Sequence, residues 1–307
     1  MTGRRGGRPH TAVVVVSHQT RAQALTCLDS LASAGADEVV VVDTGSTDGT
    51  AEAVRAAHPG VRVLAVDNLG FGAGANLGAA VTRAPVVVVC NADVRFDAGS
   101  VADLAARLDE RADVAAAGPA VRYPDGRPQA SARRLPGLAT AIGHAVLSRP
   151  WPGNPWTVRY RATDADPERP RDVDWLSGCC LALRREAFET VGGFDPGYFL
   201  YVEDVDLGVR LRAAGWRLRY EPSARVVHEV GASTGPVGPG GRVSTRRRAW
   251  SLAIHARSLD RFYGLHLATT PLRRLARPLL RVGLAAWVGA TLVLERITGR
   301  GHTTTGE

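Results

Sequence analysis

The amino-acid sequence predicts an α/β protein with a doubly wound, mostly parallel central sheet. Through the first third of the 307 residues, runs of β-branched residues alternate with segments of helical periodicity. These runs are almost entirely apolar, which is typical of parallel strands covered on both faces. Each run ends in a cluster of polar residues, and in such sheets ligands bind beyond the carboxyl ends of the strands. We therefore expect a binding site at this edge of the sheet.

The elements follow one another in a regular order. The first strand precedes a helix that places Leu25, Leu28 and Leu31 on one face. The expected strands are 13–16, 39–42, 61–66, 86–89 and a run that ends at His228. The expected helices are 22–31, 50–57, a segment from the glycines at 70–74 to residue 83, one that starts near 184, and 203–215.

Charge and composition narrow the class of partner. The net charge is +8 and every cation is arginine, which favours phosphates or an acidic membrane surface. Nucleic acid is not expected, because the arginines are dispersed and no array of aromatic residues is interleaved with them. The four cysteines show neither CxxC nor zinc-site spacing, which predicts reduced thiols in a cytosolic protein. No apolar run reaches the ~20 residues of a spanning helix, so neither secretion nor integral membrane insertion is expected.

Two polar segments suit a nucleotide. Asp43 ends a buried strand, and its carboxylate can accept a hydrogen bond from the imide N–H of uracil or thymine. The alternative is that Asp43 forms a turn and caps the next helix. Capping is the expected role of Asp48. The segment 70–78 imitates a dinucleotide fingerprint, but its spacing is GxGxxxG and it follows the third strand. It still suits a diphosphate at a helix N-terminus, with Asn76 as a contact or as a packing residue.

Carboxylates gather at three later points. Asp93, in the sequence Asn91-Ala92-Asp93, can hold a hard divalent cation, although a simple β-turn is the alternative. Glu203, Asp204 and Asp206 crowd a helix start, where acidic residues are also favoured for the helix itself. His228 ends another apolar run and is a candidate ligand or a structural histidine.

Taken in order, these motifs resemble the family 2 glycosyltransferases of the GT-A fold. The resemblance covers about residues 11–233 and includes the segments 40–50, 68–76, 91–93, 174–178, 192–195 and 203–206, with His228 at its end. Within the family the chain is most similar to the rhamnosyltransferases that act on polyprenyl-diphosphate-linked sugars, as in the actinobacterial cell-wall linker.

The resemblance implies a role for each position. Asp204 would be the catalytic base, and Glu203 would orient the acceptor or the base. Asp93 and His228 would hold Mg²⁺ or Mn²⁺, because Asn91, at the first position of the usual DxD motif, is a neutral amide. Gln19 stands where many relatives carry Asn. The implied nucleotide-binding residues are Ser17, Gln19, Asp43, Gly70, Asn76 and Asn91, and Trp175 would line the acceptor site.

Arginines near Trp175 suit an acceptor diphosphate. Arg133 and Arg134 lie in the segment expected to face the acceptor, as do Arg159 and Arg161. Solvated surface arginines are the alternative in a chain that uses no lysine.

The expected reaction is an inverting, metal-dependent transfer of a sugar onto a polyprenyl-diphosphate-linked acceptor in cell-wall or polysaccharide assembly. The resemblance favours dTDP-L-rhamnose as donor. Three alternatives stay open: another donor such as UDP-galactofuranose, an NAD(P)-dependent oxidoreductase, and an inactive sugar-binding protein.

The expected organisation is a disordered basic arm at 1–10, a nucleotide half at 11–112, an acceptor half at 113–233, a mobile loop at 234–248 and a helical extension at 249–307. In the extension, four arginines precede the apolar stretch 282–294. This pattern suits a helix on an acidic membrane surface, which predicts a cytoplasmic protein peripheral to the inner face of the membrane. A core helix or a homodimer contact is the alternative.

Overall fold

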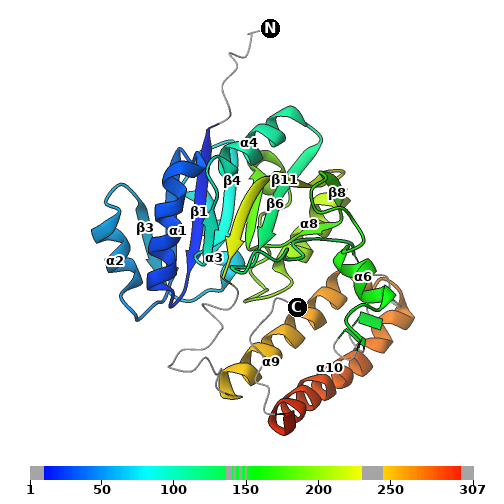
Figure 1. The fold of residues 1–307 in the computed structure, drawn as a ribbon. Coiled ribbons are helices and arrows are strands. Elements are labelled where there is room, and N and C mark those ends of the chain that lie inside the picture. The colour runs from blue at the N-terminus through cyan, green and yellow to red at the C-terminus, as the bar shows by residue number, and fades with distance from the viewer. Residues whose placement is uncertain are drawn as a thin grey trace.

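The structure is a computed structural model that describes residues 10–135, 140, 143–144, 147–148, 151–229 and 245–298. A nine-stranded mixed sheet forms its centre, with helices on both faces (Figure 1). The main path of the sheet runs β3-β2-β1-β4-β10-β6-β11-β5, and β8 pairs with β11. The expected doubly wound α/β class is confirmed.

The four strands expected in the first third form the parallel half of the sheet. They are β1 (Thr11–Ser17), β2 (Glu38–Thr44), β3 (Arg62–Val66) and β4 (Val86–Asn91). The register pairs Ser17 with Asp43 and Val16 with Asn91, so the polar clusters after β1, β2 and β4 lie at one edge. Local composition alone was enough to identify these strands, because each is a valine-rich run.

The second half of the sheet is mixed. Strand β10 (Cys180–Arg184) lies antiparallel between β4 and β6 (Val114–Arg122), and β6 runs parallel to β11 (Arg217–His228). Two short strands, β5 (Val94–Phe96) and β8 (Arg171–Val173), pair antiparallel with β11. The pairing of β5 with β11 brings His228 opposite Val94. A separate ladder joins β7 (Ala132–Arg133) to β9 (Trp175–Leu176).

Alternate residues of the strands bury two cores. On one face, Val13 and Val15 pack with α1 (Arg21–Ala34), α2 (Thr50–Ala57) and α4 (Ser100–Glu110). On the other, Val14 and Val16 pack with α3 (Phe71–Ala80), α7 (Arg185–Thr190) and α8 (Glu203–Ala213). A further helix, α6 (Pro155–Arg161), begins at Asn154, whose side chain accepts from the N–H of Thr157. The helices therefore fix both faces of the sheet and leave its carboxyl edge open.

The glycine-rich segment packs against the sheet. It forms the body of α3, where Gly74 and Gly78 let the helix approach β1 and β2 closely. A Cβ on Gly78 would stand 2.2 Å from Cγ1 of Val14, and the N–H of Phe71 already bonds the carbonyl of Phe199. Close packing against the sheet thus accounts for Gly74 and Gly78.

The C-terminal segment consists of α9 (Thr245–Phe262), a π-helical turn η1 (Tyr263–Leu267) and α10 (Pro271–Thr298), and α9 and α10 pack on each other (Figure 1). Residues 245–248, expected in a loop, open α9 instead. The rest of that predicted loop and residues 1–9 of the predicted arm lie outside the described residues. Helix α10 is long and apolar enough over Pro271–Val293 to cross a membrane, with almost none of it buried. From the sequence we counted only residues 282–294 as apolar, because we began the stretch after Arg281.

Candidate active site

A large cavity opens at the carboxyl ends of β1, β2 and β4. Its volume is about 1430 Å³, and its lining includes Val16, Thr44 and Asn91 from these three strands. The opposite wall comes from α8 and from the C-terminal segment 246–276. Of the predicted site residues, the cavity collects Ser17, Gly70, Asn91, Asp93, Arg133, Trp175, Glu203, Asp204 and His228.

Three buried polar atoms in this lining have no hydrogen-bond partner among the described residues. They are Asp93 Oδ1, Trp175 Nε1 and Glu203 Oε2. Leaving a buried polar atom unpaired costs about 1–3 kcal/mol each, and charged groups cost more. Three such atoms around one cavity indicate that a polar ligand satisfies them.

Asp93 and His228 form the pair best suited to a cation. Both side chains are buried, and His228 Nε2 lies 3.2 Å from Asp93 Oδ1. On the other side of the ring, Nδ1 lies 3.1 Å from Gln129 Oε1; because that oxygen only accepts, Nδ1 carries the proton. The Asp93 carboxylate and the His228 Nε2 atom therefore face each other, and both are groups that a divalent cation accepts as ligands. Asn91 Nδ2 also approaches Nε2, at 3.3 Å.

The residues therefore fit a divalent metal, with carboxylate and imidazole as ligands and Gln129 fixing the ring. No cluster of three or more acidic, histidine or cysteine side chains with metal-site geometry occurs in the described part of the chain. Any metal held here would take its remaining ligands from water and from a substrate.

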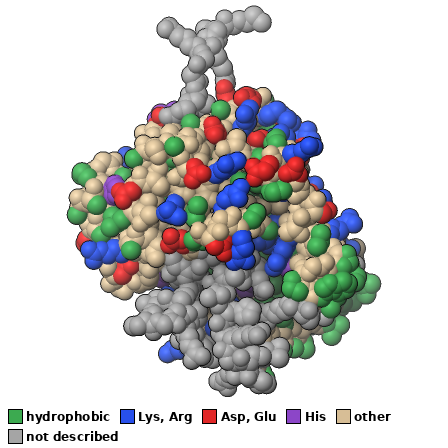
Figure 2. Space-filling model, viewed as in Figure 1, with side chains coloured by type: hydrophobic (Ala, Val, Ile, Leu, Met, Phe, Trp, Pro, Cys, Tyr) green, Lys and Arg blue, Asp and Glu red, His purple; other side chains and the backbone are tan. Residues whose placement is uncertain are grey.

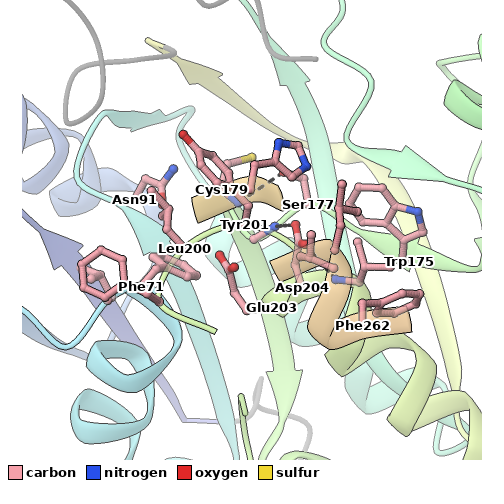
Figure 3. A pocket seen from close by; sticks show the side chains of 18 of the residues that line it. Phe71, Asn91, Trp175, Ser177, Cys179, Leu200, Tyr201, Glu203, Asp204 and Phe262 are labelled. Atoms are coloured by element: carbon pink, nitrogen blue, oxygen red, sulfur yellow. Dashed lines mark hydrogen bonds between the residues drawn. The ribbon is translucent and has the colours of Figure 1, made fainter. Parts of the chain in front are cut away.

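Glu203 and Asp204 begin α8 after a strained turn. Tyr201 and Val202 have positive φ values of 69° and 71°, a conformation rare for a β-branched residue. The N–H groups of Gly178 and Val205 each donate to Asp204 at 2.8 Å. Figure 3 shows the two carboxylates side by side, between Phe71 on one side and Trp175 and Phe262 on the other. The strained turn thus presents both carboxylates to the cavity.

Burial perturbs both carboxylates. Burial and the adjacent charge of Asp204 raise the pKa of Glu203 to about 8. Burial also raises the pKa of Asp204, while its backbone hydrogen bonds and the charge of Arg133 act in the opposite direction. The hydrogen bonds from Gly178 and Val205 and the charge of Arg133 favour the charged form of Asp204, whereas burial beside that charge favours the protonated form of Glu203.

Trp175 and Arg133 form a joint wall next to Asp204. The Arg133 guanidinium lies 5.0 Å from the Trp175 ring and 5.4 Å from the Tyr160 ring. Its Nε donates to the carbonyl of Ala130, which fixes the side chain. An aromatic face with an unpaired indole N–H suits a sugar ring.

Four predicted residues do not line the cavity. Asn76 bonds both backbone groups of Phe194, which supports its packing alternative, and Arg134 pairs with Asp164 at the surface. Gln19 bonds Thr47, and Asp43 is buried, with Ser46 Oγ donating to it. The next residue along the strand, Thr44, does line the cavity. Asp43 is therefore adjacent in the chain to a cavity-lining residue but does not itself line the cavity.

Several lining residues were missed. His18 Nδ1 lies 2.7 Å from the carbonyl of Thr44, and Asn68 lies beside it at 3.4 Å. The cluster after the first strand contained His18, so its position was the available signal. Gln129 and the lining residues of the C-terminal segment 246–276 gave no such signal, because only long-range folding brings them to the cavity.

Comparison with known proteins agrees with this geometry. The profile of glycosyl transferase family 2 matches residues 12–192, and that of glycosyl transferase family group 2 matches 155–299. The chain is 45% identical to the N-acetylglucosaminyl-diphospho-decaprenol L-rhamnosyltransferase of Mycobacterium tuberculosis over 218 residues, which is 67% of this chain and 71% of that protein.

Two solved structures share the fold. One is a mannosyltransferase of Pyrobaculum calidifontis with GDP-Man and Mn²⁺ (TM-score 0.53, 20% identity, covering 96% of this chain and 80% of that one). The other is GalNAc-T7 with UDP, GalNAc and Mn²⁺ (TM-score 0.57, 16% identity, 95% and 58%). The profile match spans more than half of the chain, and the sheet is that of the GT-A fold. The chain is a glycosyltransferase and belongs to glycosyl transferase family 2.

Proposed function

We propose that the enzyme transfers L-rhamnose from dTDP-L-rhamnose to N-acetylglucosamine carried on a polyprenyl diphosphate, with inversion at the anomeric carbon. The name of the relative that is 45% identical supports both the sugar and the acceptor. The observation that carries the proposal is the set of unpaired polar atoms on Asp93, Trp175 and Glu203 around one cavity.

Asp204 is the base in this proposal. Its carboxylate removes the proton of the acceptor hydroxyl while that oxygen bonds the anomeric carbon and the bond to the nucleoside diphosphate breaks. The N–H groups of Gly178 and Val205 hold the carboxylate in place for this step. Protonated Glu203 donates to the acceptor or to Asp204, and Trp175 packs on the acceptor sugar.

Asp93 and His228 would hold Mg²⁺ or Mn²⁺, with Gln129 orienting the imidazole. A bound divalent ion supplies charge neutralisation for the departing diphosphate. Asn91 and Ser17 contact the donor, and the nucleobase occupies the end formed by His18, Thr44 and Asn68, next to Asp43. The glycines of α3 pack on the sheet, so nothing in this region supports the NAD(P) alternative.

We also propose that the C-terminal segment holds the enzyme on the cytoplasmic face of the membrane. Leu272, Leu275 and Leu279 on α10 are at least three quarters exposed, and the same helix carries five arginines, four of them between residues 273 and 281. An apolar strip beside cations suits an interface with anionic lipid headgroups.

A donor panel tests the proposal. The purified protein is incubated with dTDP-L-rhamnose, UDP-galactofuranose and other sugar nucleotides, with acceptor, and with or without EDTA, and released nucleotide is measured. We expect metal-dependent release of dTDP above all others. Preferential release of UDP would show that the donor is a UDP-sugar and would contradict dTDP-L-rhamnose. Nucleotide release that EDTA does not affect would contradict the role of the metal.

A further inference from the structure

The cavity is larger than one substrate requires. Its volume of about 1430 Å³ exceeds the ~300–1,000 Å³ typical of pockets for a single small ligand. The donor proposal uses only the half at the ends of the strands. The other half is bounded by the cavity-lining side chains of α9, η1 and α10, which we call the C-terminal wall.

The charge of the C-terminal wall points to an anion. Its lining residues include Arg246, Arg247 and Arg273, and no acidic residue of the described segment 246–276 lines the cavity. Arg246 and Arg273 are exposed, so a ligand that enters the cavity can reach both side chains. Arginine forks match phosphate oxygens in pairs, which makes a diphosphate the matching chemistry.

The C-terminal wall is joined to the turn that carries the base. Ser258 Oγ donates to the carbonyl of Leu200 at 2.9 Å, and the Tyr201 hydroxyl bonds Ser251 at 2.8 Å. Farther along, His266 Nε2 lies 2.6 Å from the buried Asp206 carboxylate on α8. A phosphate held by the wall is thereby kept in a fixed relation to Asp204.

An apolar exit continues from this wall. Leu272 lines the cavity yet is 77% exposed, so the cavity opens to solvent there. Leu275 and Leu279 follow on the same helix, 77% and 75% exposed. Figure 2 shows hydrophobic side chains gathered at the lower right edge of the molecule, near the C-terminal helices. A diphosphate at the arginines would therefore leave its hydrocarbon chain beside an apolar strip.

We propose that Arg246 and Arg273, with Arg247 beside them, bind the diphosphate of the acceptor, and that its isoprenoid chain leaves over Leu272 along α10. This inference rests on the proposed acceptor class and assigns its subsite. In this subsite Arg246 and Arg273 take the role that the sequence analysis suggested for Arg134, whose side chain pairs with Asp164.

A binding experiment tests the subsite without catalysis. Farnesyl diphosphate is titrated by calorimetry into protein saturated with dTDP and Mn²⁺, so that the donor half is filled. The double variant Arg246→Gln/Arg273→Gln is compared with Arg257→Gln/Arg274→Gln, which removes two cations from the same helices but outside the cavity lining. We expect about tenfold weaker binding or worse in the first variant and wild-type binding in the second.

Two results overturn the subsite: wild-type affinity in the Arg246/Arg273 variant, or equal losses in both variants, which would reflect overall charge. Farnesol, which lacks the diphosphate, is expected to bind all three proteins equally. In transfer assays the first variant should show a KM for lipid-linked acceptor raised about tenfold, with an unchanged KM for donor. Wild-type protein that binds farnesyl diphosphate but transfers no sugar would contradict the proposed function and leave the subsite standing.

Discussion

Replacing Asp204 by Asn removes the base while keeping its shape. The carboxylate accepts one hydrogen bond at each oxygen, from Gly178 and from Val205. The amide keeps one of these and turns its NH₂ toward the other donor, so one charge-assisted hydrogen bond of about 1.5–3 kcal/mol is lost. Removing a buried charge next to Glu203 offsets part of this, so we expect a change in unfolding free energy of no more than about 2 kcal/mol.

The effect on catalysis is expected to be larger. Loss of a general base lowers kcat by about 10²–10⁴, which corresponds to about 3–5 kcal/mol of activation free energy. The assay is release of dTDP from dTDP-L-rhamnose with acceptor present, together with calorimetric titration of dTDP. Affinity for dTDP should stay within about twofold, because the residue faces the acceptor half in the proposed arrangement. The exposed Asp113→Asn, outside the cavity, is the matched control. A kcat within about tenfold of wild type would refute the role of Asp204 as base.

Further predictions concern pH, metal and packing. Because the pKa of Glu203 rises from 4.5 to about 8 on folding, the native state binds more protons than the unfolded state between these pH values. The free energy of unfolding should therefore fall with rising pH by up to roughly 1.4 kcal/mol per pH unit. The variant Glu203→Gln should flatten this slope, as measured by urea titrations at several pH values. An unchanged slope would contradict the raised pKa. Gln129→Leu leaves His228 Nδ1 without its partner and should weaken Mn²⁺ affinity about 10–100-fold by calorimetry, whereas wild-type affinity would remove Gln129 from the metal site. Gly78→Ala places a Cβ 2.2 Å from Val14 and should cost about 1–3 kcal/mol of stability in urea denaturation, whereas Gly60→Ala, with open space around it, should not; equal effects would refute the packing explanation.

The parallel half of the fold was predictable because its strands are short valine runs whose helices show their own periodicity. Strand β6 was not, since its sequence Val114–Arg122 is rich in alanine and contains Gly118 and Pro119. Only pairing with β10 and β11, which includes an irregularity between Glu221 and Arg225, makes it a strand. Tertiary pairing overrides local preference here.

The candidate site shows the same division. Asp93, Trp175, Asp204 and His228 follow recognisable motifs and line one cavity, whereas Asp43, which was expected to join them, does not line it. The sequence leaves Asn76 open between a ligand contact and a packing residue, because its partner Phe194 is 118 residues away. The C-terminal wall likewise depends on contacts such as that of His266 with Asp206, which no local pattern encodes.

The most direct test of the account is the structure of the product. Purified protein, dTDP-L-rhamnose, Mn²⁺ and polyprenyl-diphosphate-linked N-acetylglucosamine are incubated together, and the lipid-linked product is isolated and its new linkage determined by NMR. The account predicts one added rhamnose with an inverted anomeric centre, formed only when the metal is present. A product with retained configuration, or none at all from active folded protein, would contradict it.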